Sequence, residues 1–209
     1  MGEVHWLEQI HGASVVTVGR PTVGREVGSD AGERDLPVVR SGRGDGLVSA
    51  DLSIALAVLT ADCASIALGS SEGVFGAVHA GWRGLSAGVV SRAVARMREL
   101  GAGDVVGALG PCIHAECYEF SEPDLDVVCA AVGETARGRT ADGHPALDMP
   151  AAVSSVLADS GVREMVGTDD CTACARGYFS HRGRGDTGRQ ALVVWSARPA
   201  PARTAPGDR

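Results

Sequence analysis

The chain has 209 residues, and its 44% hydrophobic and 22% charged content is typical of one folded domain rather than of a disordered chain. The 19 basic residues are outnumbered by 26 acidic ones, and the formal net charge of −7 disfavours general binding to nucleic acid or anionic membranes. No lysine is present, which excludes Schiff-base and lysine general-base chemistry. The apolar runs are shorter than the roughly 20 residues of a membrane span. The first residues lack a signal-peptide pattern, so a cytoplasmic location is expected.

Short apolar runs between glycine-rich turns predict a series of strands. The run SIALAVL is fully apolar and typical of a strand that is covered on both faces. Residues 19–46 are rich in Gly, Arg and Pro without periodicity, so we expect them to form an excursion on the surface. The expected strands cover 14–18, 53–59, 65–68, 74–79, 104–109, 162–166 and 191–195.

Apolar residues at helical spacing predict three helices. In the first of them Val90, Val94 and Met97 would face a core while arginines face water. Residues 197–209 have the Pro/Ala/Arg composition of a disordered tail. The expected helices cover 85–100, 124–132 and 151–157, and the mixture of elements predicts an α/β (α+β) fold with one core.

His79 stands where an expected strand ends and a helix begins near Trp82. Backbone N–H groups at a helix start favour an anion, and the guanidinium of Arg83 is suited to phosphate. A buried core histidine and a surface arginine are an equally good interpretation of the same residues.

Asp62 and Cys63 follow another expected strand. If the two strands are neighbours in one sheet, these residues emerge beside His79 at one edge. A Cys beside a His is suited to nucleophilic catalysis or to binding a borderline-soft metal, whereas a single cysteine is more often an inert buried thiol. His11, in a turn bounded by Gly12, could supply a third ligand, although these positions form no local motif.

Two further features have ordinary and functional interpretations. Cys171 and Cys174 form a C-x-x-C without a second ligand pair, so two ordinary thiols are expected, with redox or metal chemistry as the alternative. The Gly/Arg-rich segment 178–190, which includes Arg182 and Arg189, is either a solvated loop or an anion-binding loop.

Six motifs in order give the chain a family resemblance. They are LEQIHG (7–12), TADC (60–63), VHAGWRGL (78–85), LGPCI (109–113), CYEF (117–120) and FSHR…TGRQ (179–190). Together they resemble the bacterial laccase-domain proteins, once called polyphenol oxidases and now regarded as purine nucleoside phosphorylases. The resemblance runs from about Trp6 to Trp195.

The resemblance implies a four-layer α/β/β/α fold with mixed β-sheets, like that of the YfiH proteins. It implies one domain over residues 1–196 that lacks the N-terminal segment usual in the family. Family members usually have Pro at the position of Ser65 and Tyr at that of His181, which would alter the pocket wall.

The resemblance also implies a metal centre and an activity. One zinc ion per chain would be bound by His11, Cys63 and His79, with copper as an alternative metal. Three protein ligands leave a position open for water or substrate, as in catalytic zinc sites. The implied reactions are phosphorolysis of adenosine, inosine, guanosine or methylthioadenosine to the free base and a ribose-1-phosphate, and hydrolytic deamination of adenosine. The expected partners are these nucleosides and phosphate, with neither nucleic acid nor membrane, in a monomer or homodimer.

Further residues receive roles as hypotheses. Phosphate would be bound by Gly81 and Arg83 at the helix start and by Arg182 and Arg189. Asp62 would act as an acid that helps the purine leave, beside the catalytic pair of Cys63 and His79.

Three other functions compete with this interpretation. The first is a copper-dependent phenol oxidase, against which none of the six histidines forms a His-x-His pair. The second is a cysteine hydrolase with Cys63 as nucleophile and His79 as base. The third is an inactive truncated member of the family.

Overall fold

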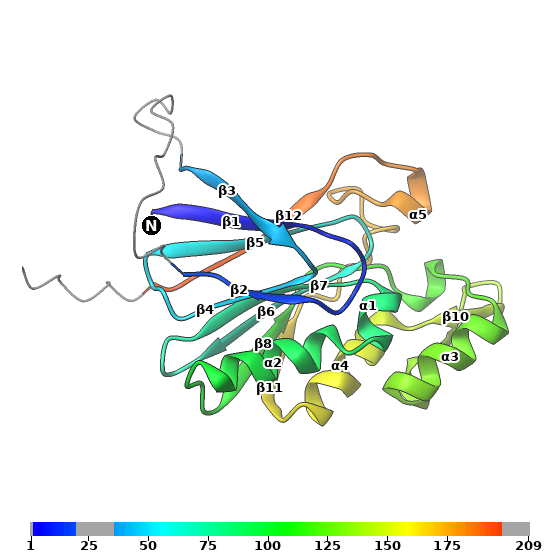
Figure 1. Ribbon diagram of the computed structural model, residues 1–209. Coiled ribbons are helices and arrows are strands. Elements are labelled where there is room, and N and C mark those ends of the chain that lie inside the picture. Colours follow the sequence, from blue (N-terminus) through cyan, green and yellow to red (C-terminus); the bar gives the residue numbers. More distant parts are fainter. Residues whose placement is uncertain (1, 20–35, 198–209) are drawn as a thin grey trace, which may run out of the picture.

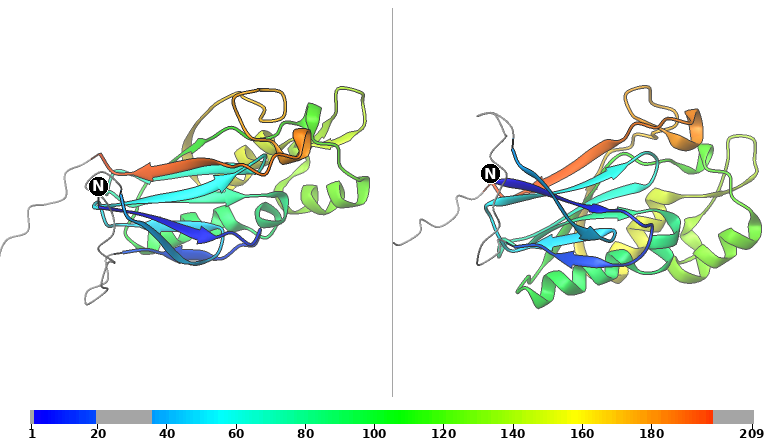
Figure 2. Two further views of the ribbon diagram at one scale, coloured as in Figure 1. Left: turned by 90° about the horizontal axis from the view of Figure 1, so that it is seen from above. Right: turned by 45° about the horizontal axis from the view of Figure 1, so that its top comes forward.

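The computed structural model describes residues 2–19 and 36–197, which form two β-sheets packed face to face (Figure 1). Helices cover the outer face of the six-stranded sheet. Figure 2 shows the four-stranded sheet from above, and none of the described helices lies over it. The described residues therefore build three layers, β/β/α.

The four-stranded sheet is mixed. Its strands lie in the order β12-β5-β1-β3, with β1 parallel to both neighbours and β12 antiparallel to β5. Leu56 and Val58 are buried between the sheets, together with Phe75 of the other sheet. The strands are β1 (Glu3–Glu8), β3 (Val38–Arg43), β5 (Ile54–Thr60) and β12 (Gln190–Trp195).

The six-stranded sheet is also mixed, in the order β11-β8-β6-β7-β4-β2. Its outer pairs, β11 with β8 and β4 with β2, are parallel, whereas the inner pairs are antiparallel. In the central hairpin Ser65 of β6 lies opposite His79 of β7. The strands are β2 (Val15–Thr17), β4 (Gly46–Ser49), β6 (Ala64–Ser70), β7 (Phe75–Ala80), β8 (Val105–Leu109) and β11 (Val162–Gly167).

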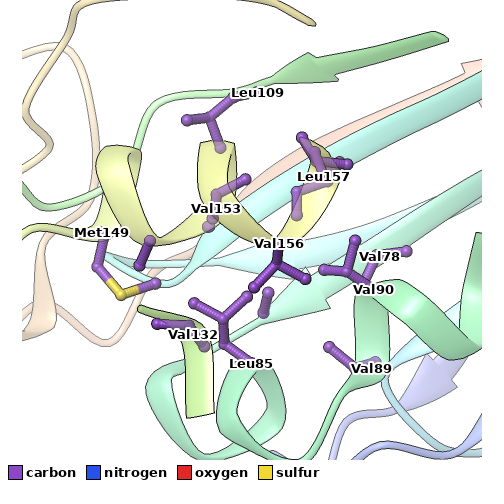
Figure 3. Close-up of a cluster of buried hydrophobic side chains, with 14 of the residues drawn as sticks. Val78, Leu85, Val89, Val90, Leu109, Val132, Met149, Val153, Val156 and Leu157 are labelled. Atoms are coloured by element: carbon purple, nitrogen blue, oxygen red, sulfur yellow. The ribbon is translucent and has the colours of Figure 1, made fainter. Parts of the chain in front are cut away.

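The helices bury apolar faces against the six-stranded sheet. Figure 3 shows Val78, Val90 and Val156 together in this core. The Ser121 and Asp148 side chains cap α3 and α4 by accepting backbone N–H hydrogen bonds, and each helix has a proline in its first turn. The helices are α1 (Trp82–Ser86), α2 (Val89–Glu99), α3 (Glu122–Val132), α4 (Met149–Asp159) and α5 (His181–Arg184), with 3₁₀ turns η1 (Ala115–Cys117) and η2 (Glu134–Ala136) and a ribbon of β9 (Arg137–Arg139) and β10 (Pro145–Leu147).

The mixed α/β fold with mixed sheets is confirmed, and every predicted strand has a counterpart. The predicted helix over 85–100 is wrong in one respect: Gly88, at φ 83°, separates α1 from α2. The left-handed conformation that glycine adopts readily ends one helix before the next begins.

The surface excursion predicted for 19–46 is wrong for its second half. Residues 20–35 lie outside the described residues, but β3 is part of a sheet, and Asp45 and Gly46 are buried. The strand β1 was not predicted. The helical layer expected over the four-stranded sheet is not formed by the described residues, and positions 198–209 of the predicted tail lie outside them. Within residues 2–19 and 36–197, no helix has the length and apolarity to cross a membrane.

Candidate metal centre

The structure brings His11, Cys63 and His79 together. Their ligand atoms all lie within 4.8 Å of one another. His11 lies in the turn after β1, Cys63 lies between β5 and β6, and His79 lies near the end of β7. Three segments that are distant in the sequence therefore supply one donor each.

Cys63 reaches His79 by a different route from the one expected. The strand before Cys63, β5, belongs to the four-stranded sheet, whereas β7 belongs to the other sheet. The two residues meet because β6 pairs with β7 and puts Ser65 opposite His79. Cys63 lies just before β6, where the chain passes from one sheet to the other.

Asp45 connects two of these donors and was missed in the sequence. Its fully buried carboxylate accepts hydrogen bonds from the backbone N–H groups of His11, at 2.9 Å, and Gly12, at 2.8 Å. The same carboxylate lies 2.9 Å from Nδ1 of His79. A carboxylate on one imidazole nitrogen orients the ring and leaves the other nitrogen available to a metal.

The turns at the centre are held in an uncommon backbone conformation. In the described part of the chain, the only residues other than glycine with positive φ are His11, at 56°, and Asp62, at 88°. Such residues cost roughly 1–3 kcal/mol and persist where their surroundings fix them. The hydrogen bonds to Asp45 fix the turn that carries His11.

Gly81 leaves room for the donors. A Cβ atom at this position would lie 3.0 Å from Sγ of Cys63 and 3.1 Å from Cδ2 of His11. The φ of Gly81 is −73°, so a larger residue is disfavoured by the lack of space and not by the backbone conformation. The glycine of the HAGW motif is therefore matched to the three candidate donors.

The pKa values of Cys63 and His79 are shifted by their neighbours in this group. Burial by itself raises the pKa of the Cys63 thiol, but hydrogen bonds from His11 and His79 lower that pKa to about 6. Burial by itself lowers the pKa of His79, yet its bonds to Asp45 and Cys63 raise that pKa to about 9. Without a metal, the pair therefore favours thiolate and imidazolium at neutral pH. A metal would replace the proton between them.

The donor set fits a metal ion. Two imidazoles and one thiolate are ligands that zinc and copper accept. Asp45 supplies the outer hydrogen bond that metal-binding histidines usually have. Three protein donors leave a coordination position open, and all three line a cavity of about 520 Å³.

The cavity has the volume of a small-molecule site. Its wall includes two of the predicted anion-binding arginines, Arg182 and Arg189, whereas Arg83 is not part of it. The lining residues are Trp6, Leu7, Gln9, His11, Leu59, Thr60, Ala61, Asp62, Cys63, His79, Tyr118, His181, Arg182 and Arg189.

A family model described as multi-copper polyphenol oxidoreductase laccase matches residues 1–197. The chain belongs to this family. A Streptomyces coelicolor relative named purine nucleoside phosphorylase SCO2081 is 40% identical over 195 residues, which are 92% of this chain and 74% of the relative. The Mycobacterium tuberculosis purine nucleoside phosphorylase Rv2149c is 37% identical over 92% of this chain and 72% of its own length.

Solved structures give the same family relationship. The Neisseria meningitidis protein NMB0706 matches with a TM-score of 0.76 and 29% identity, over 93% of this chain and 75% of that one. YlmD from Geobacillus stearothermophilus matches with a TM-score of 0.71 and 31% identity, over 90% of this chain and 72% of that one.

The arginines of this family member differ in their surroundings. The exposed guanidinium of Arg83 lies over the ring of Trp82, 4.2 Å from its centroid. Arg182 lies over the ring of Tyr118 at 5.0 Å. Nη1 of Arg189 donates to three backbone carbonyls of its own loop. Arg182, in α5, and Arg189, directly before β12, both line the cavity.

Asp62 holds the segment that carries Arg182. One carboxylate oxygen accepts a hydrogen bond from Oγ1 of Thr172 at 2.7 Å, and the other accepts one from the backbone N–H of Arg182 at 2.6 Å. Of these two partners Arg182 lines the cavity, and Thr172 lies in the loop after β11. This arrangement favours a positioning role for Asp62 over the acid role predicted from adjacency.

Three other cavity residues were not singled out in the sequence. Trp6, Gln9 and Tyr118 lie within or beside the family motifs, and these motifs are the signal that could have indicated them. The Gln9 side chain exchanges two hydrogen bonds with the backbone of Leu59, at 2.7 and 2.8 Å. It thereby fixes the start of the His11 turn against the end of β5.

Replacing Gly81 should weaken metal binding. In Gly81→Ala the new methyl group displaces Cys63 and His11, so we expect the metal affinity to fall at least about tenfold, or ~1.4 kcal/mol. Competition with a chelator measures this affinity. The matched control is Gly69→Ala, because a Cβ there meets no atom within 4 Å. Equal affinities in the two variants would contradict the steric role of Gly81.

Replacing Asp45 should weaken metal binding through His79. An amide has only one accepting oxygen and carries no charge, so Asp45→Asn cannot serve all three donors. We expect the metal affinity to fall about 10–100-fold. Asp148→Asn makes the same chemical change at the α4 cap, where Asn is an equally good residue. An unchanged affinity in Asp45→Asn would exclude the orienting role.

Proposed function

We propose that this chain is a zinc-dependent purine nucleoside phosphorylase that also deaminates adenosine. The observation that carries the proposal is one cavity that combines three metal donors with two arginines from the 178–190 loop. The relatives at 37–40% identity, which are named purine nucleoside phosphorylases, support the same reaction.

The metal would be held by His11, Cys63 and His79. Zinc suits a thiolate and two imidazoles with a fourth position open. When bound, it would supply a Lewis acid that polarises a substrate atom or activates a water molecule. The residues of the chain bind and orient what surrounds it.

Substrate binding follows from the walls of the cavity. Trp6 and Tyr118 line the cavity with aromatic rings of the kind that contact a purine, and Arg182 covers one face of the Tyr118 ring. Burial raises the pKa of Tyr118 to about 12, so its hydroxyl stays protonated and is able to donate a hydrogen bond to the substrate. Arg182 and Arg189 provide donors for phosphate. Arg83, stacked on Trp82, is assigned a lesser role, and Gly81 a steric one.

Phosphorolysis needs little from the protein beyond position and charge. An oxygen of phosphate attacks the ribose C1′ while the bond from C1′ to the purine nitrogen breaks, and the purine leaves with a proton. Arg182 and Arg189 would hold the phosphate in line for this attack. In the deamination of adenosine, water would displace ammonia from the purine C6 in the same cavity.

A cysteine hydrolase is the second candidate, and one observation favours it. Asp45, His79 and Cys63 are connected as in a nucleophilic triad, with the carboxylate on Nδ1 of the imidazole and a thiol whose pKa is lowered to about 6. A thiolate that binds zinc tightly is not available as a nucleophile. Metal content and turnover on one sample therefore separate the two functions.

The test of the proposed function is turnover of adenosine with phosphate, followed by chromatography. We expect adenine and ribose-1-phosphate, with inosine reporting deamination. Both products should disappear in Cys63→Ala and after chelation, and zinc should restore activity only to the chelated wild type. Cys129→Ala, a buried thiol in α3, is the control. Full turnover in the chelated protein would overturn the metal-dependent function.

Arg182→Ala tests the phosphate site separately. Loss of a charge-assisted hydrogen bond costs about 1.5–3 kcal/mol, so the KM for phosphate should rise about tenfold or more. The KM for the nucleoside should change much less. The matched control is Arg163→Ala. Arg163 is an exposed residue of β11 that forms an ion pair with Asp104. Equal rises in both KM values would mean that Arg182 supports the cavity without binding phosphate.

A further inference from the structure

A second group of metal-binding side chains lies beside the loop that lines the cavity. It consists of Glu116, Cys117, Cys171 and Cys174, whose ligand atoms all lie within 4.8 Å of one another. Glu116 and Cys117 belong to η1, and the two other cysteines belong to the loop after β11. We call this group the three-cysteine cluster. The fold brings Cys117 beside Cys174 of the C-x-x-C, although 57 positions separate them in the sequence.

Two of the cluster's sulfur atoms lie too far apart for a disulfide bond and a little closer together than two ligands of one zinc ion. Sγ of Cys117 lies 3.2 Å from Sγ of Cys174, and all of the cluster's cysteines are free thiols. A disulfide bond is about 2.05 Å long. Two thiolates on one zinc ion at about 2.3 Å lie about 3.8 Å apart. The observed arrangement requires only a small expansion to accept the ion.

The surroundings of the cluster also fit bound thiolates. The backbone N–H of His114 points to Sγ of Cys171 at 3.4 Å, the kind of outer hydrogen bond that tunes a metal ligand. The guanidinium of Arg184 donates to the carbonyls of Thr172 and Ala173, which lie between the two loop cysteines. The positive charge of Arg184 therefore lies next to the segment that carries Cys171 and Cys174, whose thiolates would be negative.

Crowding of the thiols gives a reason for a cation. Sγ of Cys117 lies 3.2 Å from Sγ of Cys174, and the ligand atoms of Cys171 and Glu116 lie within 4.8 Å of both. Three neighbouring sulfurs resist ionisation unless a positive charge lies among them. A divalent ion supplies that charge and lowers the pKa of each thiol it binds.

We propose that Cys117, Cys171 and Cys174, with Glu116 as the fourth ligand, form a structural zinc site. Four protein ligands close the coordination sphere, which is typical of structural rather than catalytic zinc. The ion would join η1 to the loop after β11. It would do so whatever molecule the cavity binds, so the proposal is independent of the proposed function.

The site would stabilise two walls of the cavity. Tyr118 follows Cys117 directly, and Thr172 follows Cys171 and donates its hydroxyl hydrogen to Asp62. Asp62 in turn precedes Cys63 of the first metal centre. The structural ion would therefore fix both the aromatic wall and the anchor of the arginine loop.

Zinc content of the full chain tests the proposal. Protein prepared with reductant and zinc should hold about two zinc ions per chain after dialysis, and Cys174→Ser and Cys63→Ala should each hold about one. Because Cys174 is exposed, the serine hydroxyl introduces no buried polar group, and any effect comes from loss of the ligand. Cys129→Ala should keep the wild-type content. Wild-type zinc content in Cys174→Ser would overturn the proposal.

Cobalt substitution gives a second measurement on the same proteins. Thiolate-to-cobalt absorption should be strong in the wild type and in Cys63→Ala, and should fall to the level of one thiolate in Cys174→Ser. A disulfide between Cys117 and Cys174 in protein prepared with reductant, detected by intact mass and alkylation, would also overturn the proposal. Loss of turnover in Cys63→Ala alone bears on the proposed function and leaves this zinc site untouched.

Discussion

The rest of the site depends on the hydrogen bonds of the buried Asp45 carboxylate to His79 and to the backbone of residues 11 and 12. A buried ionised group costs several kcal/mol unless hydrogen bonds satisfy it. Burial by itself would raise the pKa of Asp45, but its bonds to His79 and to the backbone of the 11–12 turn lower it. The carbonyl of Asp45 also accepts the backbone N–H of His79 at 2.7 Å. One residue thus joins the N-terminal turn to the six-stranded sheet, and the two imidazoles meet only because this connection is made.

The two described residues other than glycine with positive φ show how the six-stranded sheet and the arginine loop approach the same cavity. His11 and Asp62 both lie in turns where the chain leaves the four-stranded sheet. Asp45 satisfies the backbone of the first turn, and the carboxylate of Asp62 holds Thr172 and Arg182 from the second. A carboxylate thus supports the first strained turn, whereas the second strained turn supplies the carboxylate that holds the arginine loop.

The helices α2, α3 and α4 were predicted from apolar residues at helical spacing and seven strands from short apolar runs, and the family motifs indicated the three candidate metal donors. The strand β1 was missed because its inward positions alternate between Leu7 and the buried polar His5, which hides the apolar pattern. Asp45 was missed because it stands between two glycines in a segment without periodicity, and its partners are backbone groups that no sequence pattern reveals. The C-x-x-C was interpreted as two ordinary thiols, and Cys117, the third cysteine of the proposed zinc site, approaches it only through the pairing of β8 with β11.

The donor atoms alone do not separate the zinc enzyme from a copper protein, since two imidazoles and a thiolate are also found in copper electron-transfer centres. The surroundings of the donors favour a phosphorylase over an electron-transfer centre. An electron-transfer centre has no need of a cavity of about 520 Å³ or of guanidinium groups from a separate loop. Arg182 and Arg189 offer the planar, charged donors that recognise phosphate. Both arginines belong to the segment that Asp62 anchors beside Cys63. This placement favours a reaction in which phosphate itself is a reactant.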